Sequence, residues 1–193
     1  MRKLTKGEIA RKVIHFTASL IPIIYYFFVE RRTALVILGI LTVIFLFAEV
    51  LRMLIPNLYD LYLKIFGWML RSHEAKYNLT GATYVFIGSF LTIFFFPKDV
   101  ATTVLLFLTI GDSTACILGM KYGRIKIFNK TLEGSLAFTI SSLIATIWIT
   151  SIPFHIKIVG VLVAALVELL PKKFDDNISI PIISGLIITI LGI

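Results

Sequence analysis

The chain alternates between long stretches without charge and short segments rich in charge. Five stretches contain no Lys, Arg, Asp or Glu, and they cover residues 13–29, 33–48, 77–97, 134–156 and 177–193. Helices need about 17–25 consecutive, mainly apolar residues to cross a bilayer. The pattern therefore predicts an all-α, polytopic membrane helix bundle. We treat residues 1–193 as one integral-membrane domain.

Weaker apolar stretches raise the predicted number of transmembrane helices to about seven. The predicted spans are residues 11–29, 33–51, 79–96, 100–120, 134–152, 154–170 and 177–193. Asp112 interrupts the fourth span, and Lys157 and Glu168 interrupt the sixth. Pro22 and Pro181 lie inside spans, where neighbouring helices can satisfy the freed backbone groups.

The segment around residues 55–72 has a different pattern. Leu58, Leu61, Tyr62 and Ile65 recur at helical spacing, and charged residues occupy much of the remainder. This is typical of an amphipathic helix that lies in the membrane interface, with Trp68 at the level of the headgroups. A short span that dips into the bundle is the alternative.

The distribution of basic residues predicts the orientation, because cytoplasmic loops carry an excess of Lys and Arg. With the N-terminus in the cytoplasm, 15 of the 19 Lys and Arg residues lie on the inner side. The formal net charge of +8 then reflects this bias together with phosphate binding, so we predict no nucleic-acid partner. The single cysteine, Cys116, forms no internal disulfide and no metal-binding pattern.

Polar side chains collect at the predicted inner ends of six spans. An ionisable group inside a span costs several kcal/mol unless it is paired or hydrated, so it indicates function. Asp112 is the clearest case, about 18 Å into its span at 1.5 Å per residue. The polar positions at these ends are Arg11, His15, Glu49, Arg52, Asn78, Thr80, Asp112, Glu168, Asp175, Asp176 and Asn177, with Gly81 next to Thr80.

The stretch GDSTACILGMKYGRIKIFNKTLEGS, residues 111–135, combines small residues with charges. Ala115, Gly119 and Gly123 recur every four residues, which is typical of a close helix-packing seam. A seam does not account for Asp112 or for the four basic residues that follow it. Carboxylates beside bases suit Mg²⁺ that bridges to phosphates, and the helix start at Gly134 favours anions. The residues thus predict a phosphorylated ligand, a nucleotide being favoured.

GDSTACILGMKYGRIKI, followed by NKTLEGS, resembles the nucleotide-binding signature of the CTP-dependent lipid kinases. That family includes dolichol kinase, phytol kinase and the CTP-using diacylglycerol kinase. ARKVIHF, AEVLR, TGATYVFIGS and VELLPKKFDDNISIP are similar to further blocks of the family and occur in the same order. The resemblance implies a catalytic domain that transfers the γ-phosphoryl group of CTP to a membrane lipid hydroxyl at the cytoplasmic face. The acceptor is expected to be a polyprenol, dolichol or other prenol, or diacylglycerol.

The resemblance also implies roles for particular residues. For catalysis we expect Asp112, His15 and Glu49, without ranking them as the base. For Mg²⁺ we expect Asp112, Asp176 and Glu168. The expected nucleotide-binding residues are Arg11, Gly119, Lys121, Gly123, Arg124, Lys130, Glu133 and Gly134. Arg52, Asn78, Gly81 and Asn177 are expected to complete the site.

Two other functions and several purely structural roles compete with this hypothesis. The same signature resembles that of phosphatidate cytidylyltransferases, which attach CMP to a lipid phosphate. A transporter of an anionic solute also uses charges inside spans, but the predicted outer half carries few polar groups. Glu49 and Arg52, three residues apart, also suit a structural ion pair. Arg11 and Lys12 suit charges that only orient the protein in the membrane.

Overall fold

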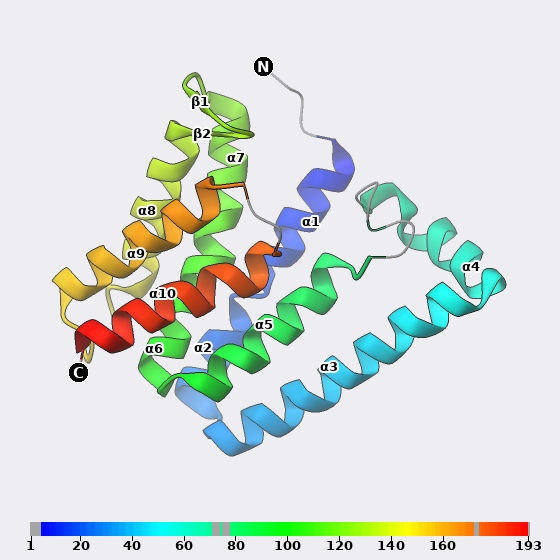
Figure 1. Ribbon diagram of the computed structural model, residues 1–193, viewed down its shortest axis with the longest axis horizontal. Coiled ribbons are helices and arrows are strands. Elements are labelled where there is room, and N and C mark those ends of the chain that lie inside the picture. The colour runs from blue at the N-terminus through cyan, green and yellow to red at the C-terminus, as the bar shows by residue number, and fades with distance from the viewer. Residues whose placement is uncertain (1–4, 71–73, 75–77, 172–173, 193) are drawn as a thin grey trace.

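The computed structural model describes residues 5–70, 74, 78–171 and 174–192, and this part of the chain is almost entirely helical (Figure 1). Two short strands form an antiparallel hairpin with Lys126 opposite Thr131 and Ile127 opposite Lys130. The helices are α1 (Lys6–Thr17), α2 (Leu20–Phe28), α3 (Arg31–Leu54), α4 (Pro56–Phe66), α5 (Gly81–Phe95), α6 (Lys98–Leu106), α7 (Asp112–Tyr122), α8 (Leu132–Thr146), α9 (Phe154–Leu169) and α10 (Asp176–Gly192). A 3₁₀ turn η1 (Gly67–Met69), a π-helical turn η2 (Phe107–Gly111), and strands β1 (Lys126–Ile127) and β2 (Lys130–Thr131) complete the elements.

The helix predicted over residues 11–29 is divided into α1 and α2. Thr5 and Glu8 form a capping box that starts α1, and the helix ends at Ala18. Pro22 explains the break, because it has no N–H to donate to the carbonyl of Ala18 and its ring clashes with that group. The chain therefore changes direction at this point and continues as α2.

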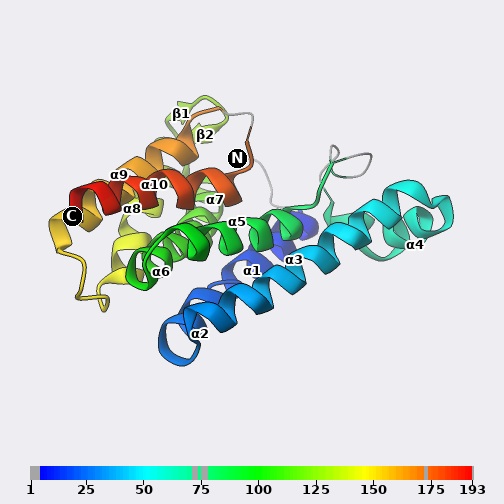
Figure 2. The same cartoon turned by 60° about the horizontal axis from the view of Figure 1, so that its bottom comes forward.

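The centre of the bundle is the continuous helical path from α6 through η2 to α7. Every residue of α6 from Val100 to Leu106 is buried, and so are Phe107 and Leu108 of η2. α7 packs against α8, and α10 packs against both α5 and α9. In contrast, α3 packs mainly along α5 and lies at the edge of the molecule in both views (Figures 1 and 2).

Among the described residues, two helical segments are long and apolar enough to cross a membrane: Arg31–Leu54 and Lys98–Tyr122. Shorter apolar helices are Gly81–Phe95, Leu132–Thr146 and Asp176–Gly192. α3 exposes many large apolar side chains, as expected for a surface that faces lipid. Seven spans and a cytoplasmic N-terminus stay predictions.

α4 is an amphipathic helix that folds back at the end of α3 (Figure 1). It has 11 residues, which corresponds to a length of about 16 Å, much shorter than a bilayer core of about 30 Å. Trp68, in the following turn, is 60% exposed. These features favour the interfacial interpretation of this segment over a transmembrane span.

Basic residues from the predicted outer side neutralise the carbonyl ends of helices. A cation near a helix C-terminus is favourable because it meets unpaired carbonyls and the negative end of the helix dipole. Arg31 donates to Ile93 and Phe94 at the end of α5, Lys98 to Val29 after α2, and Lys157 to Thr146 of α8. Lys157 is only 2% exposed. These bases therefore have structural partners, in keeping with a functional site at the other end of the bundle.

Gly88 allows α5 and the start of α10 to approach closely, which yields a first prediction. A Cβ atom at Gly88 would collide with the backbone carbonyl of Asn177. Because backbone cannot move aside as a side chain does, we expect Gly88→Ala to destabilise the protein by about 1–3 kcal/mol. Thermal unfolding of the detergent-solubilised protein measures the effect.

Gly39→Ala is the matched control, because a Cβ there meets only the ring of Phe90, at 3.4 Å. Replacing a helical glycine with alanine at such a position is expected to stabilise by about 0.5–1 kcal/mol. Equal thermal stability of the Gly88 and Gly39 variants would contradict the assigned close approach.

Candidate active site

Within the part of the chain that the structure describes, we distinguish three clusters of paired charges, which connect α1 with α7, the hairpin with α9 and α10, and α3 with α5. We call them the Asp112 cluster (Lys12, His15, Asp112), the Lys130 cluster (Lys130, Glu168, Asp176) and the Glu49 cluster (Glu49, Arg52, Thr80, Thr83). Each joins helices that are distant in the sequence. Acids and bases of these clusters also border two cavities.

The Asp112 cluster joins α1 to the first residue of α7. The Nζ atom of Lys12 donates to Oδ2 of Asp112 at 2.6 Å. Nε2 of His15 lies 3.5 Å from the same oxygen and 3.2 Å from the carbonyl oxygen of Leu108. Because a carbonyl oxygen only accepts, Nε2 of His15 must donate to it. The neutral ring then keeps its lone pair on Nδ1.

The π-helical turn η2 places Asp112 at this position. Such turns inside helices are rare and are frequent at functional sites. Gly111, the last residue of η2, lies so close to α8 that a Cβ would meet the hydroxyl of Ser142 and the ring of Phe138. The turn and the glycine together hold the start of α7 against α8 and direct Asp112 toward α1.

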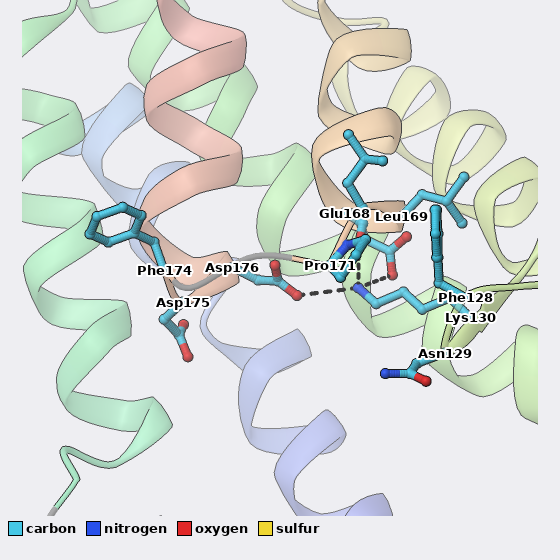
Figure 3. Close-up of a pocket in the computed structure, with 10 residues that line it drawn as sticks. Phe128, Asn129, Lys130, Glu168, Leu169, Pro171, Phe174, Asp175 and Asp176 are labelled. Carbon is cyan, nitrogen blue, oxygen red and sulfur yellow. Dashed lines mark hydrogen bonds and ion pairs between the residues drawn. The ribbon is translucent and has the colours of Figure 1, made fainter.

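The Lys130 cluster joins the hairpin to α9 and α10 (Figure 3). Nζ of Lys130 lies 2.6 Å from Oε1 of Glu168, 2.5 Å from the Glu168 carbonyl oxygen and 3.3 Å from Oδ2 of Asp176. Burial acts to lower the pKa of Lys130, but Asp176 and Glu168 outweigh it and raise the pKa above its ordinary value of 10.5. Lys130 therefore carries its charge throughout the neutral pH range.

The Glu49 cluster joins α3 to the start of α5. Glu49 and Arg52 are 5% and 4% exposed, and their ion pair confirms the pairing predicted from their spacing. The other carboxylate oxygen of Glu49 accepts from the backbone N–H of Thr80 at 3.0 Å and from the hydroxyls of Thr80 and Thr83 at 2.6 and 3.1 Å. Arg52 also donates to the carbonyl of Asn78. Every oxygen of this buried carboxylate is thus hydrogen-bonded.

Two cavities meet at Asp175 and Asp176, which line both. The smaller, of about 300 Å³, lies between the hairpin and the end of α9 and includes Lys130 and Phe128. The larger has a volume of about 530 Å³. Its polar lining includes the Asp112 and Glu49 clusters together with Arg11, Glu74, Asp175, Asp176 and Asn177, and apolar side chains form most of the remaining walls. A cavity of this size with apolar walls and convergent polar groups is typical of a ligand site.

The structure brings together many of the residues expected to form the site. Arg11 binds the carbonyl of Met69 and, with the other predicted residues His15, Glu49, Arg52, Gly81, Asp112, Asp176 and Asn177, lines the larger cavity. Lys130, Glu168 and Asp176 line the smaller one.

Other expected nucleotide-binding residues occupy different positions. Gly119 and Gly134 lie in the seam between α7 and α8, and Gly123 ends α7 against Thr131. Lys121 lies over the ring of Tyr122. The Glu133 carboxylate accepts a hydrogen bond from the backbone N–H of Ile125 and so holds the hairpin to α8. Backbone N–H groups near this carboxylate, together with Arg124, lower the pKa of Glu133. The binding roles of these residues stay predictions.

Several residues of the clusters were not expected from the sequence. Lys12 was assigned only to membrane orientation, although it precedes His15 by three residues and therefore shares its helix face. Asp175 and Thr80 were expected among the polar groups at the inner ends of their spans, but their contacts were not. Asp175 lines both cavities, and Thr80 and Thr83 hold Glu49. Threonine near a helix start is too common to indicate such a role.

The donor atoms of the site suit Mg²⁺, although no group of three or more His, Cys, Asp and Glu side chains gathers for a metal within the described residues. Mg²⁺ at nucleotide sites uses one or two carboxylates and completes its coordination with phosphate and water oxygens. Asp112 and Asp176 both line the larger cavity and satisfy that requirement.

One bacterial and one archaeal protein match nearly the whole chain. Uncharacterized protein RP860 of Rickettsia prowazekii is 31% identical over 184 residues, which cover 91% of this chain and 90% of that protein. Uncharacterized protein MJ1137 of Methanocaldococcus jannaschii is 32% identical over 190 residues, covering 94% and 92%. This chain belongs to their family.

A eukaryotic relative carries a named activity. CTP-dependent diacylglycerol kinase 1 of Saccharomyces cerevisiae is 28% identical over 214 residues, covering 95% of this chain and 73% of the kinase. This homology supports a CTP-dependent lipid kinase, and with the two long apolar helices it indicates a membrane protein. No family model matches the chain. No solved structure matches it significantly.

The Glu49 cluster yields a second prediction, about isolated charge. Glu49→Leu leaves the guanidinium of Arg52 buried without its carboxylate, which is expected to cost about 3–5 kcal/mol of stability. The double variant Glu49→Leu/Arg52→Leu removes both charges and is expected to recover most of that loss. Thermal unfolding of both single variants, the double variant and the unaltered protein completes a double-mutant cycle. A double variant as unstable as Glu49→Leu alone would contradict the explanation.

Proposed function

We propose that the protein is a CTP-dependent kinase that transfers the γ-phosphoryl group of CTP to the hydroxyl of a membrane lipid alcohol at the cytoplasmic face. The arrangement of the two cavities is the observation that carries this proposal. One cavity is small and lies beside the half-buried Lys130 and its acids, and the other passes from charged groups to apolar walls. They share Asp175 and Asp176, so a donor in one and an acceptor in the other would meet there.

CTP occupies the smaller cavity in this proposal. Lys130 binds the phosphates by exchanging a carboxylate partner for a phosphate oxygen, and its fixed positive charge supports this role. Phe128 is 63% exposed at the rim and offers a flat surface on which the cytosine base can stack. Mg²⁺, held by Asp112 and Asp176, would supply neutralisation of the phosphate charge.

The acceptor occupies the larger cavity, with its hydroxyl beside the Asp112 cluster. The hydroxyl oxygen attacks the γ-phosphorus, the bond to the β–γ bridging oxygen breaks, and CDP leaves. Nδ1 of His15 takes the proton of the hydroxyl, because Nε2 already donates to Leu108. Lys12 and Arg11 neutralise charge on the transferred group. Positioning and charge neutralisation provide most of the catalysis in phosphoryl transfer.

Glu49 has a different role in this proposal. Its carboxylate accepts hydrogen bonds from Thr80, Thr83 and Arg52, so it has little capacity to take a further proton. We assign it to anchoring α3 against α5, which keeps one wall of the larger cavity in place.

The decisive assay, and the third prediction, uses purified protein with γ-labelled CTP, Mg²⁺ and a panel of prenols and diacylglycerol. We expect label on a lipid alcohol, and we expect Asp112→Asn to lower the rate at least 100-fold while the protein stays folded. Asp60→Asn, on exposed α4, is the matched control and should keep normal activity. Pyrophosphate release with a lipid phosphate would indicate a cytidylyltransferase instead. Full activity of Asp112→Asn would refute the assignment of this carboxylate.

Phe128 yields a fourth prediction, in which stability and binding change in opposite directions. It has a φ angle of 53° at the first position of the two-residue hairpin loop, where glycine is preferred. Phe128→Gly is therefore expected to maintain or raise the melting temperature. Because it removes the stacking surface, it should raise KM for CTP about five-fold or more.

Phe128→Trp is the matched control, since it keeps an aromatic surface in the same strained conformation. We expect KM for CTP to stay near that of the unaltered protein. An unchanged KM in Phe128→Gly would show that the base binds elsewhere.

A further inference from the structure

The apolar part of the larger cavity is lined by stripes of side chains on three separate helical segments. Ile14, Ala18 and Ile21 form one stripe along α1 and the start of α2. Phe45 and Ala48 lie on α3, and α5 contributes a stripe that includes Ala82, Val85 and Phe86. Within each helix, spacings of three or four residues place these side chains on one face, and Ile21 continues the lining after the break between α1 and α2.

All three stripes change from polar to apolar in the same spatial direction. On α1 the charged Arg11 and Lys12 precede the apolar stripe, and polar Thr80 likewise precedes α5. α3 has the opposite order, since Phe45 and Ala48 come before Glu49 and Arg52. The polar residues come near the C-terminal end of α3 but near the N-terminal ends of α1 and α5. Their common location therefore results from how the helices pack and not from their order along the chain. The result is an amphipathic groove with its charged end at the Asp112 cluster.

The groove is accessible from the side of the bundle near its charged end. Ile14 is 53% exposed, and Ala48 and Ala82 are exposed as well, whereas Ile21, Phe45 and Phe86 farther along the stripes are partly buried. The walls belong to differently packed parts of the bundle, because α1 packs against α7 whereas α3 packs against α5. α3 lies along the edge of the molecule (Figure 2). In a membrane, the exposed apolar faces of these helices contact lipid chains.

We propose that the groove between α1–α2, α3 and α5 receives the apolar chain of the lipid alcohol sideways from the bilayer, and this rests on the function proposed above. The hydroxyl then lies at the charged end, beside Asp112 and His15. On α1 the stripe from Ile14 to Ala18 extends over about 6 Å at 1.5 Å per residue, and Ile21 follows after the break before α2. The groove therefore binds the part of the chain next to the headgroup, and the remainder stays in the bilayer.

The first experiment, which makes the fifth prediction, obstructs the groove. Ala48→Trp places an indole in it, whereas Val43→Trp places the same group on a different face of α3, where the native side chain is 65% exposed. With a long-chain acceptor from the assay above, we expect Ala48→Trp to raise KM for the lipid at least ten-fold and to leave KM for CTP unchanged. Val43→Trp should leave both constants unchanged. Size-exclusion profiles and thermal unfolding establish that both variants fold.

Two kinetic outcomes overturn the groove while leaving the kinase assignment intact. One is an unchanged lipid KM in folded Ala48→Trp. The other is an equal rise in Val43→Trp, which would show that bulk anywhere on α3 disturbs the enzyme.

The second experiment does not depend on activity, so it separates failure of the groove from failure of the proposed function. A prenol and a diacylglycerol, each with a diazirine in the chain near the hydroxyl end, are photolysed with the protein in vesicles. We expect crosslinks to peptides that contain Ile14, Ala48 or Phe86, reduced by unlabelled lipid and by Ala48→Trp. Crosslinks confined to the Val43 face, or insensitive to competitor, overturn the proposal. The probe that labels the groove more strongly identifies the class of chain that it accepts.

Discussion

A charge buried in an apolar bundle must be paired, and this requirement organises the functional end of the molecule. The ionised groups cannot be solvated by lipid or by packed apolar side chains, so each one needs an opposite charge or several hydrogen bonds. Lys12 with Asp112 joins α1 to α7, and Lys130 joins the hairpin to α9 and α10. The pairs connect elements 38 to 100 residues apart. Pairing of charge thus sets which helices meet at the cavities.

The two ends of the bundle satisfy their charges in different ways. At the predicted outer end, Arg31, Lys98 and Lys157 bind helix carbonyls, so backbone geometry supplies their partners. At the other end, carboxylates supply the partners and border space that a ligand can enter. A lysine that donates to a helix carbonyl keeps that partner, whereas a lysine paired with a carboxylate can share its charge with a phosphate group. This difference supports placing the proposed ligand site at the end with the carboxylates.

The helical segments and several site residues were predictable because they depend on local properties of the chain. Apolar runs predicted helices, and the three-residue spacing predicted the pairing of Glu49 with Arg52. Asp112 was predictable because a carboxylate within an apolar run is costly. The pairing of Lys12 with Asp112 was not, since it spans 100 residues and depends on how α1 packs. The π-helical turn before Asp112 was also missed, because it arises from packing against α8 and has no periodic signal of its own.

The glycines of residues 111–135 also act on the site through the packing of helices. Gly119 and Gly134 bring the backbones of α7 and α8 together, and Gly111 does the same for η2 and α8. The neighbouring Thr131 caps α8 and lies opposite Lys126 in the hairpin that carries Lys130. Close approach of the two helices therefore determines where Asp112 and Lys130 lie relative to each other. A larger residue in this seam would separate the two charged clusters without removing any charged group, so the spacing of the glycines is itself part of the site's electrostatics.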